Sequence, residues 1–156
     1  TNGDLPDHIV IPVGNGSLLL GILKGFSELR AGGQIEGIPR LHAVQAGRVM
    51  PIVAAIRGER SPQTGVTVAG GIAVGSPARM DEIVRALKST AGTATAVSDE
   101  DILEWRDVLA QTEGVYGEPT SAAAFAGLAR LVGQGTIRSD ERVLVPITGF
   151  GLKDVQ

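Results

Sequence analysis

The chain has 156 residues, of which 14 are Lys or Arg and 17 are Asp or Glu, so its formal net charge is −3. This balance argues against nucleic acid as the main partner, because no broad basic field is available for a phosphate backbone. The absence of cysteine excludes disulfide frameworks, thiolate metal sites and a cysteine nucleophile, and the two histidines lie too far apart to suggest a metal cluster.

Targeting signals are not visible in the sequence. The chain opens with Thr-Asn-Gly-Asp, without a basic stretch that leads into an apolar run, so no signal peptide is indicated. The longest apolar run, residues 18–22, is far too short to span a membrane. We therefore expect a cytoplasmic protein with no membrane contact.

The first part of the chain alternates apolar runs with helical periodicity. Residues 8–13 form a continuous apolar run, which is typical of a strand buried on both faces. After a glycine turn, apolar residues recur at helical spacing and predict a helix over residues 17–30. A second strand is expected over residues 41–46, and Pro51 suits the first turn of the helix that follows it.

The middle of the chain continues this alternation after a loop predicted over residues 58–71. Pro77 is expected to open a helix, and residues 93–97 form the next predicted strand. Ser98 is a good N-cap, and Asp101 three residues later completes a pattern resembling a capping box.

The last third predicts three more elements. A short strand is expected over residues 115–117, and an alanine-rich helix over residues 121–132 with Gly133 as its C-cap. Residues 142–147 form a predicted final buried strand that leads into Thr148.

Strands that alternate with helices predict an α/β fold with a mostly parallel sheet and helices on both faces, a three-layer αβα arrangement over residues 1–156. Ligands bind such sheets beyond the carboxyl ends of the strands. The turns that follow the predicted strands are therefore the places where functional residues are expected.

The turn Gly14-Asn15-Gly16-Ser17 joins the first strand to the first helix. Glycines let backbone N–H groups converge on an anion, and the helix N-terminus adds partial positive charge, so a phosphate is the obvious ligand. A plain strand-to-helix turn is the alternative. The segment is not a Walker A loop, since no Gly-Lys-Ser/Thr follows it. It is not a G-x-G-x-x-G fingerprint either, because Leu19 occupies the third glycine position.

Three other turns carry candidate residues. Glu118 precedes Thr120 and Ser121, either of which could simply cap a helix. Thr148 could bond a heterocyclic nitrogen, or residues 148–154 could form a C-terminal turn with a solvated Lys-Asp pair. The small residues 68–73 could let a flat ligand lie against the backbone, or could form a flexible hinge.

Other polar residues are interpreted as structural or solvated. His8 and His42 lie within predicted strands, and we interpret both as structural. Arg57, Arg60 and Arg79 could contact anions, but solvated side chains are the simpler interpretation.

Several segments match a known family in order and spacing, from about Pro6 to Asp154. They are residues 11–16, 67–69, 71–73, 96–100, 113–114, 118–119, 121–123, 148–149 and 151–154. Together they resemble the threonine synthases, within the tryptophan-synthase-β-like (fold type II) enzymes that use pyridoxal 5'-phosphate. The resemblance implies that the chain belongs to the large cofactor domain of such an enzyme.

The resemblance also implies roles for the matching positions. The phosphate of the cofactor would be held by Gly14, Asn15, Gly16 and Ser17. Thr148 would face the pyridine nitrogen, Ala69 and Gly70 would lie near one face of the ring, and Glu118 would lie near the cofactor. The sequence departs from the family at two of these positions, since family members often carry Gly in place of Ser17 and an acid in place of Gly70.

The family's reaction converts O-phosphohomoserine and water to threonine and phosphate, so the resemblance implies a small phosphorylated amino acid as substrate. Separately, we expect a homodimer. The family's Schiff-base lysine lies in a motif upstream of the first strand, and none of Lys24, Lys88 or Lys153 lies in that motif. We therefore expect a carboxyl-terminal part of a larger two-domain enzyme, inactive alone, with no catalytic residue and no metal site of its own.

Two alternatives remain open from the sequence. The parent could be a threonine or serine dehydratase-like or cysteate-synthase-like member of the same superfamily. The chain could also be a stand-alone module that binds a phosphorylated metabolite without catalysis.

Overall fold

Four parallel strands lie at the centre of the fold. The computed structural model describes residues 5–61 and 65–153, and its strands follow the order β3-β2-β1-β4. The strands are β1 (His8–Pro12), β2 (Arg40–Ala46), β3 (Ala94–Val97) and β4 (Val143–Leu144). In the ladders of β1, His8 is opposite both Arg40 and Val143.

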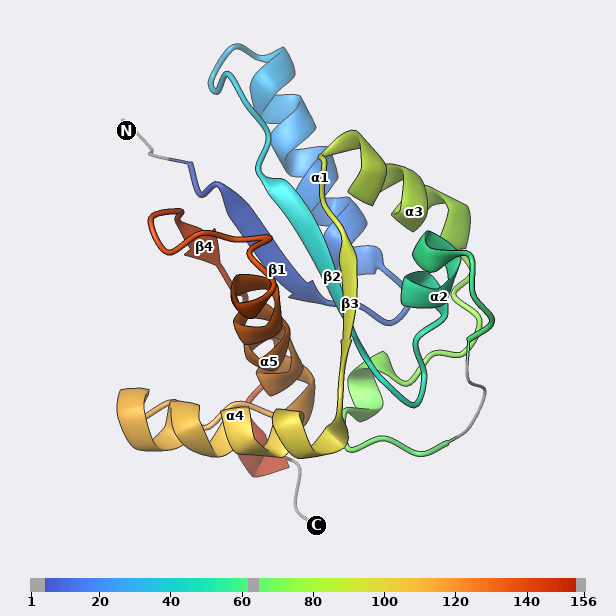
Figure 1. Cartoon of the computed structure of the whole chain (residues 1–156). Coiled ribbons are helices and arrows are strands. Elements are labelled where there is room, and N and C mark those ends of the chain that lie inside the picture. The colour runs from blue at the N-terminus through green and yellow to red at the C-terminus, as the bar shows by residue number, and fades with distance from the viewer. Residues whose placement is uncertain (1–4, 62–64, 154–156) are drawn as a thin grey trace.

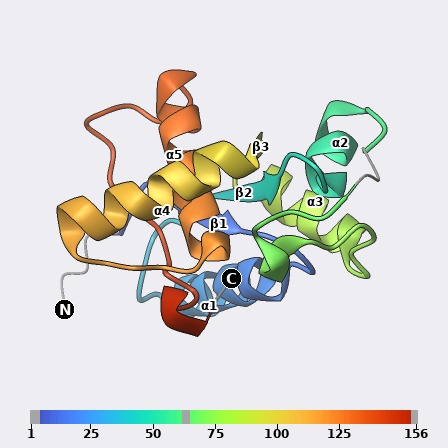
Figure 2. The same ribbon diagram turned by 90° about the horizontal axis from the view of Figure 1, so that it is seen from below.

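Helices cover both faces of this sheet. They are α1 (Ser17–Ala31), α2 (Pro51–Arg57), α3 (Met80–Ser89), α4 (Asp99–Glu113) and α5 (Pro119–Gly133), with short 3₁₀ turns η1 (Gly70–Ile72) and η2 (Gly151–Lys153). Figures 1 and 2 show α4 and α5 on one side of the strands and α1, α2 and α3 on the other. The predicted three-layer α/β fold with a parallel sheet is confirmed.

The alternation of side chains along β1 divides the core into two halves. Ile9 and Ile11 pack with residues of α1, α2 and α3, whereas Val10 packs with α4 and α5. Alternate residues of a strand point to opposite faces, so a strand between two helical layers is apolar at every position. Each fully buried aliphatic side chain contributes about 1.5–3 kcal/mol, which makes these two layers the main source of stability.

Most predicted elements form where the sequence places them. Ser98 Oγ accepts the Asp101 N–H at 3.0 Å, and the Asp101 carboxylate accepts the Ser98 N–H at 3.2 Å, so the capping box at the start of α4 is confirmed. Pro51 occupies the first turn of α2, as predicted. The buried Gln45 side chain accepts the Ile52 N–H at 2.8 Å and thereby ties this helix to β2.

Two predicted strands differ from the structure. Residues 115–117 are not a strand, because the short connection from α4 to α5 bonds to the turn at residues 149–151 instead of the sheet, through Glu118 N–H to Gly149 O and Gly151 N–H to Tyr116 O. The predicted buried strand over 142–147 pairs only at Val143–Leu144. It lies at the edge of the sheet, Leu144 and Ile147 are each 48% exposed, and Pro146 has no N–H for a ladder.

The remaining differences concern the ends of elements. Pro77 lies before α3, which begins at Met80. Helix α5 begins at Pro119 rather than residue 121, because proline is well suited to the first helical position, and Gln134 rather than Gly133 is its C-cap. The predicted loop over 58–71 ends in η1, and its residues 62–64 lie outside the described residues, as do residues 1–4 and Asp154.

Within the described ranges, no helix is long and apolar enough to cross a bilayer.

Candidate functional site

A cavity of about 610 Å³ opens at the carboxyl ends of β1 and β4. Four separate segments line it, with the residues Pro12, Gly14, Asn15, Gly16, Ser17, Leu18, Leu19, Gly71, Ile72, Glu118, Thr120, Pro146, Ile147 and Thr148. The structure thus brings together six residues that the sequence proposed separately: Gly14, Asn15, Gly16, Ser17, Glu118 and Thr148. This is the edge of the sheet at which parallel α/β folds bind ligands.

Gly16 shapes the part of the cavity wall at the start of α1. It is the N-cap of this helix and has a left-handed backbone with φ of 82°, a conformation that glycine adopts without steric cost. Because glycine has no side chain to cap the helix, the first N–H groups of α1 stay available to an external acceptor. The first turn also contains no acidic residue, so the partial positive charge of the helix end is not offset locally.

The segment around η1 contributes backbone to the cavity next to the glycine turn, since a Cβ on Gly14 would lie 3.0 Å from Gly71 O. Gly71 and Ile72 line the cavity, whereas Ala69 is fully buried in the core and Gly70 is exposed at the start of η1. The segment is anchored where Thr67 Oγ1 donates to the Asp99 carboxylate and accepts the Ala69 N–H. The placing of Ala69 and Gly70 against a bound ring stays a prediction.

The first residues of α5 bond to two other segments of the cavity wall, η1 and the turn at Thr148. The hydroxyls of Thr120 and Ser121 make these bonds, and neither caps the helix. Thr120 Oγ1 accepts the Gly71 N–H at 3.1 Å, which joins α5 to η1. Ser121 is fully buried, and its Oγ accepts the Thr148 N–H at 2.9 Å and the Gly149 N–H at 3.1 Å. The N-cap is Glu118, whose side chain makes no capping hydrogen bond.

Glu118 is the only residue with a charged side chain among the described residues that line the cavity. Its carboxylate is 14% exposed and lies 2.8 Å from Lys153 Nζ. Lys153 is 64% exposed and pairs with Glu118, while Asp154, the other member of the alternative Lys-Asp pair, lies outside the described residues. The ion pair offsets the negative charge that Glu118 would otherwise present to an anion.

The two histidines lie in neighbouring strands, away from the cavity lining. His8 Nδ1 is 2.8 Å from His42 Nε2, and the Thr93 N–H donates to His42 Nδ1 at 3.3 Å. His8 Nε2 lies 3.2 Å from Glu141 Oε2, so the contacts of the two rings form a chain that ends on this carboxylate. Burial, with smaller contributions from His8 and Arg40, lowers the pKa of His42 to about 4, which keeps it neutral.

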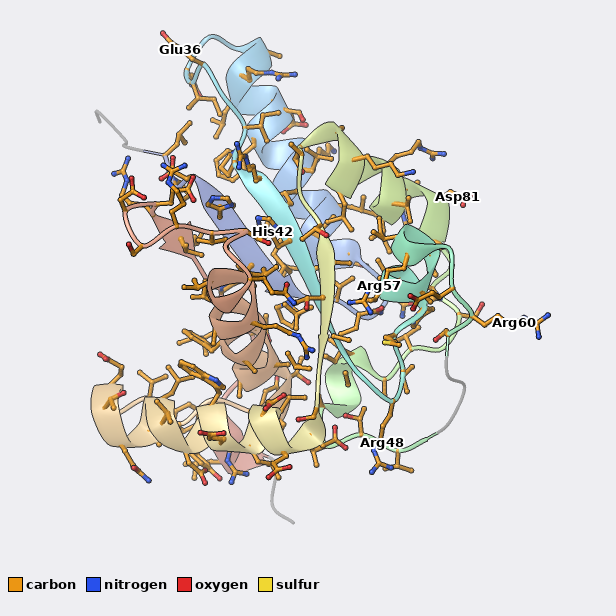
Figure 3. The ribbon with its side chains drawn as sticks, in the orientation of Figure 1. Glu36, His42, Arg48, Arg57, Arg60 and Asp81 are labelled. Carbon is orange, nitrogen blue, oxygen red and sulfur yellow. The ribbon has the colours of Figure 1, made fainter. Side chains whose placement is uncertain are left out.

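The arginines that we interpreted as solvated are all exposed. This holds for Arg57, Arg60 and Arg79, and Figure 3 shows Arg60 extending away from the body of the protein. His42, in contrast, lies at the sheet in the same view. Within the part of the chain that the structure describes, no group of three or more His, Asp or Glu side chains could hold a metal ion.

The cavity combines backbone donors suited to an anion with a neutral hydroxyl. The glycine turn offers N–H groups to a phosphate, and Thr148 places a neutral hydroxyl at the rim. Sequence reasoning missed the contacts of Ser121 and Lys153 that support the site. Ser121 and Lys153 act through partners 27 or more residues away, and no local pattern signals such contacts.

Comparison with known proteins gives the same family along almost the whole chain. The family model described as "Pyridoxal-phosphate dependent enzyme" matches residues 1–149. The threonine synthase of Methanocaldococcus jannaschii is 38% identical over 98% of this chain and 39% of its own length. The threonine synthase of Methanosarcina acetivorans is 40% identical over 97% of this chain and 38% of its own length. The threonine synthase of Mycobacterium bovis is 37% identical over 97% of this chain and 41% of its own length.

Solved structures resemble the fold at lower sequence identity. The L-serine ammonia-lyase of the fungus Rhizomucor miehei has a TM-score of 0.71 at 22% identity, over 94% of this chain and 46% of that one. The T.th. threonine deaminase has a TM-score of 0.68 at 21% identity, over the same shares. The chain spans about two fifths of the length of the curated relatives that it matches.

Proposed function

The chain belongs to the pyridoxal-phosphate dependent enzyme family, and on this premise we propose that it is the cofactor-binding part of a threonine synthase. The family's cofactor is pyridoxal 5'-phosphate. The proposed reaction of the whole enzyme converts O-phosphohomoserine and water to threonine and phosphate. The observation that carries this proposal is the 36–40% identity to threonine synthases along nearly all of the chain.

Gly14, Asn15, Gly16 and Ser17 would hold the phosphate of the cofactor. The uncapped N–H groups at the start of α1 converge there, and the helix end favours a negative ligand. A Cβ on Gly16 would lie 2.3 Å from Ile83 Cδ1, so a larger residue would disturb the turn that aims these donors. Glycine at this position therefore preserves the turn, and the charge of the helix end favours a phosphate group.

The ring of the cofactor would lie between η1 and the turn at Thr148. Thr148 would donate its hydroxyl proton to the ring nitrogen, Ala69 and Gly70 would lie near one ring face, and Glu118 would lie beside the cofactor with its charge offset by Lys153. When bound, pyridoxal phosphate supplies an electron sink for carbons of the substrate amino acid. The protein's part is to orient the ring and to set its protonation.

The remaining parts of the enzyme would lie outside this chain. Since the chain spans about two fifths of its curated relatives, we place the Schiff-base lysine and most of the substrate-phosphate site in the rest of a two-domain enzyme. In this proposal the intact enzyme is a cytoplasmic homodimer, and the 156-residue chain alone is inactive.

The direct test is phosphate release from O-phosphohomoserine by the intact enzyme, with Gly16→Ala and Gly21→Ala as a matched pair. Gly21 lies in α1, and a Cβ there would meet nothing within 4 Å. We expect release by the native enzyme and by Gly21→Ala, and a large loss in Gly16→Ala. Ammonia release from threonine or serine without phosphate release would instead indicate a dehydratase, and binding without any turnover would indicate the non-catalytic module.

A further inference from the structure

We propose that Ser121 is a positioning residue that makes Thr148 a hydrogen-bond donor toward the cavity, where the ring nitrogen of the cofactor would accept the bond. The inference rests on the proposed function, because it assumes that the ring of the cofactor lies at Thr148. Ser121 itself is fully buried and would not touch the ring.

The hydrogen bonds of Ser121 Oγ leave little freedom. A serine hydroxyl has two acceptor lone pairs and one proton. Both lone pairs are used, because the hydroxyl accepts the Thr148 N–H at 2.9 Å and the Gly149 N–H at 3.1 Å. The Thr148 hydroxyl, 3.1 Å away, therefore finds no third lone pair on Ser121 to which it could donate.

The proton of Ser121 has two possible acceptors. One is Thr148 Oγ1 at 3.1 Å, and the other is Gly149 O at 3.3 Å. The bond to Thr148 is the shorter of the two, and Gly149 O already uses one of its two lone pairs to accept the Glu118 N–H at 3.1 Å. With either acceptor, the proton of Thr148 is left to point away from Ser121.

The cavity is where that proton can go. Thr148 is exposed and lines the cavity, and among the described residues its hydroxyl has no other hydrogen-bond partner than Ser121. A ligand atom placed there receives a hydrogen bond from a neutral donor. A pyridine nitrogen with a free lone pair satisfies the donor, whereas a protonated nitrogen would bring two donors together.

The turn at Thr148 is held in this register from a second side. A Cβ on Gly149 would lie 2.2 Å from Glu118 Oε1, so the Glu118 carboxylate packs directly on the Gly149 backbone. The same carboxylate pairs with Lys153, whose own turn is bonded to Tyr116 O through the Gly151 N–H at 2.9 Å. Removal of the Ser121 hydroxyl should therefore leave the orientation of the Thr148 hydroxyl unfixed, while the turn stays folded.

The test measures the affinity of this chain for two ligands that differ at one ring atom. They are pyridoxamine 5'-phosphate and its 1-deaza analogue, in which C–H replaces the ring nitrogen. We expect the native chain to prefer the first ligand by about 3- to 10-fold, the effect of one neutral hydrogen bond. In Ser121→Ala we expect the ratio to fall close to one, while both ligands still bind through their phosphate.

Thr120→Val is the matched control, because it removes a neighbouring hydroxyl that bonds Gly71 and not Thr148. A structural effect on the cavity changes both affinities together, so this variant should keep the native ratio. A native ratio retained in Ser121→Ala, or a ratio near one in the native chain, overturns the inference and leaves the cofactor site intact. Failure of both ligands to bind the native chain refutes the proposed site, and the inference falls with it.

Amide hydrogen exchange in the ligand-free chain checks the hydrogen bonds themselves. In Ser121→Ala the Thr148 and Gly149 amides should exchange faster than in the native chain, while the Gly151 amide stays protected. Unchanged protection of Thr148 and Gly149 would show that Ser121 does not hold them. Loss of protection at all three amides would show that Ser121 supports the whole turn, which also contradicts the inference.

Discussion

Replacing Gly16 by alanine perturbs the turn on which phosphate binding is proposed to depend. Gly16 has φ of 82° and begins α1. A Cβ at this position would lie 2.3 Å from Ile83 Cδ1 and 2.5 Å from Ile83 Cγ1, inside any van der Waals contact. Ile83 is fully buried among the side chains between α1, α3 and the sheet, so it has little room to move.

The cost of this substitution has two parts. A left-handed backbone costs a residue with a Cβ roughly 1–2 kcal/mol. Overpacking a filled core costs roughly 1–3 kcal/mol more. We therefore expect Gly16→Ala to lower the free energy of unfolding by about 2–5 kcal/mol, through the sum of these two terms.

Gly21→Ala is the control, because it changes the same residue type in an exposed part of α1, where the new Cβ would meet no atom within 4 Å beyond its chain neighbours and the backbone of its own helix. Alanine has the higher helix propensity, so this variant should gain roughly 0.5–1 kcal/mol. Urea unfolding of the three proteins gives both differences, and titration with inorganic phosphate gives the affinity. Equal stability and equal phosphate affinity for the two variants would refute the role of the Gly16 turn.

Three further predictions concern residues around the sheet and cavity. Gln45→Leu should lower the free energy of unfolding by about 2–4 kcal/mol, because the buried Ile52 N–H and Val53 N–H lose their acceptor. Urea unfolding measures this difference, and a loss of less than about 0.5 kcal/mol would contradict the prediction. His42 has a folded pKa of about 4, below the ordinary 6.5, so the unfolded chain binds the proton first and stability falls as the pH drops from 6.5 toward 4. Between pH 7.5 and 5 the native chain should lose about 2 kcal/mol more than His42→Asn, and identical pH profiles would disprove the shift. Lys153→Met should weaken pyridoxamine 5'-phosphate binding by up to about 5-fold at low salt, since it leaves the Glu118 charge unpaired. Lys153→Arg should retain the affinity, and equal affinities for both variants would argue against charge compensation.

The sequence was sufficient for the alternation of strands and helices and for the segments that form the cavity. Continuous apolar runs predicted β1 and β2, and the Ser98–Asp101 pattern predicted the start of α4, since each signal is local. The same rule predicts a buried strand over residues 142–147. Their apolar side chains lie at the sheet edge, and the position of a strand within a sheet is not encoded in its own residues.

The supporting contacts of the site could not be predicted for a similar reason. The position of Ser121 indicates a helix cap, but Pro119 starts α5 earlier and leaves the serine hydroxyl to the turn at Thr148. The sequence around Lys153 indicates a solvated cation, and only the packing of η2 beside Glu118 gives it a partner. Both depend on contacts between segments distant in sequence, which the tertiary fold alone determines.

The most direct test of the central claim is to map where pyridoxamine 5'-phosphate binds, by following backbone amide chemical shifts of the chain during a titration. If this cavity holds the cofactor, the largest changes are expected at the amides of Gly14, Asn15, Gly16 and Ser17, with a second group at Thr148 and Gly149. Changes confined to the exposed arginines at Arg79 and Arg85, with the glycine turn unaffected, would contradict the claim that this cavity is the cofactor site.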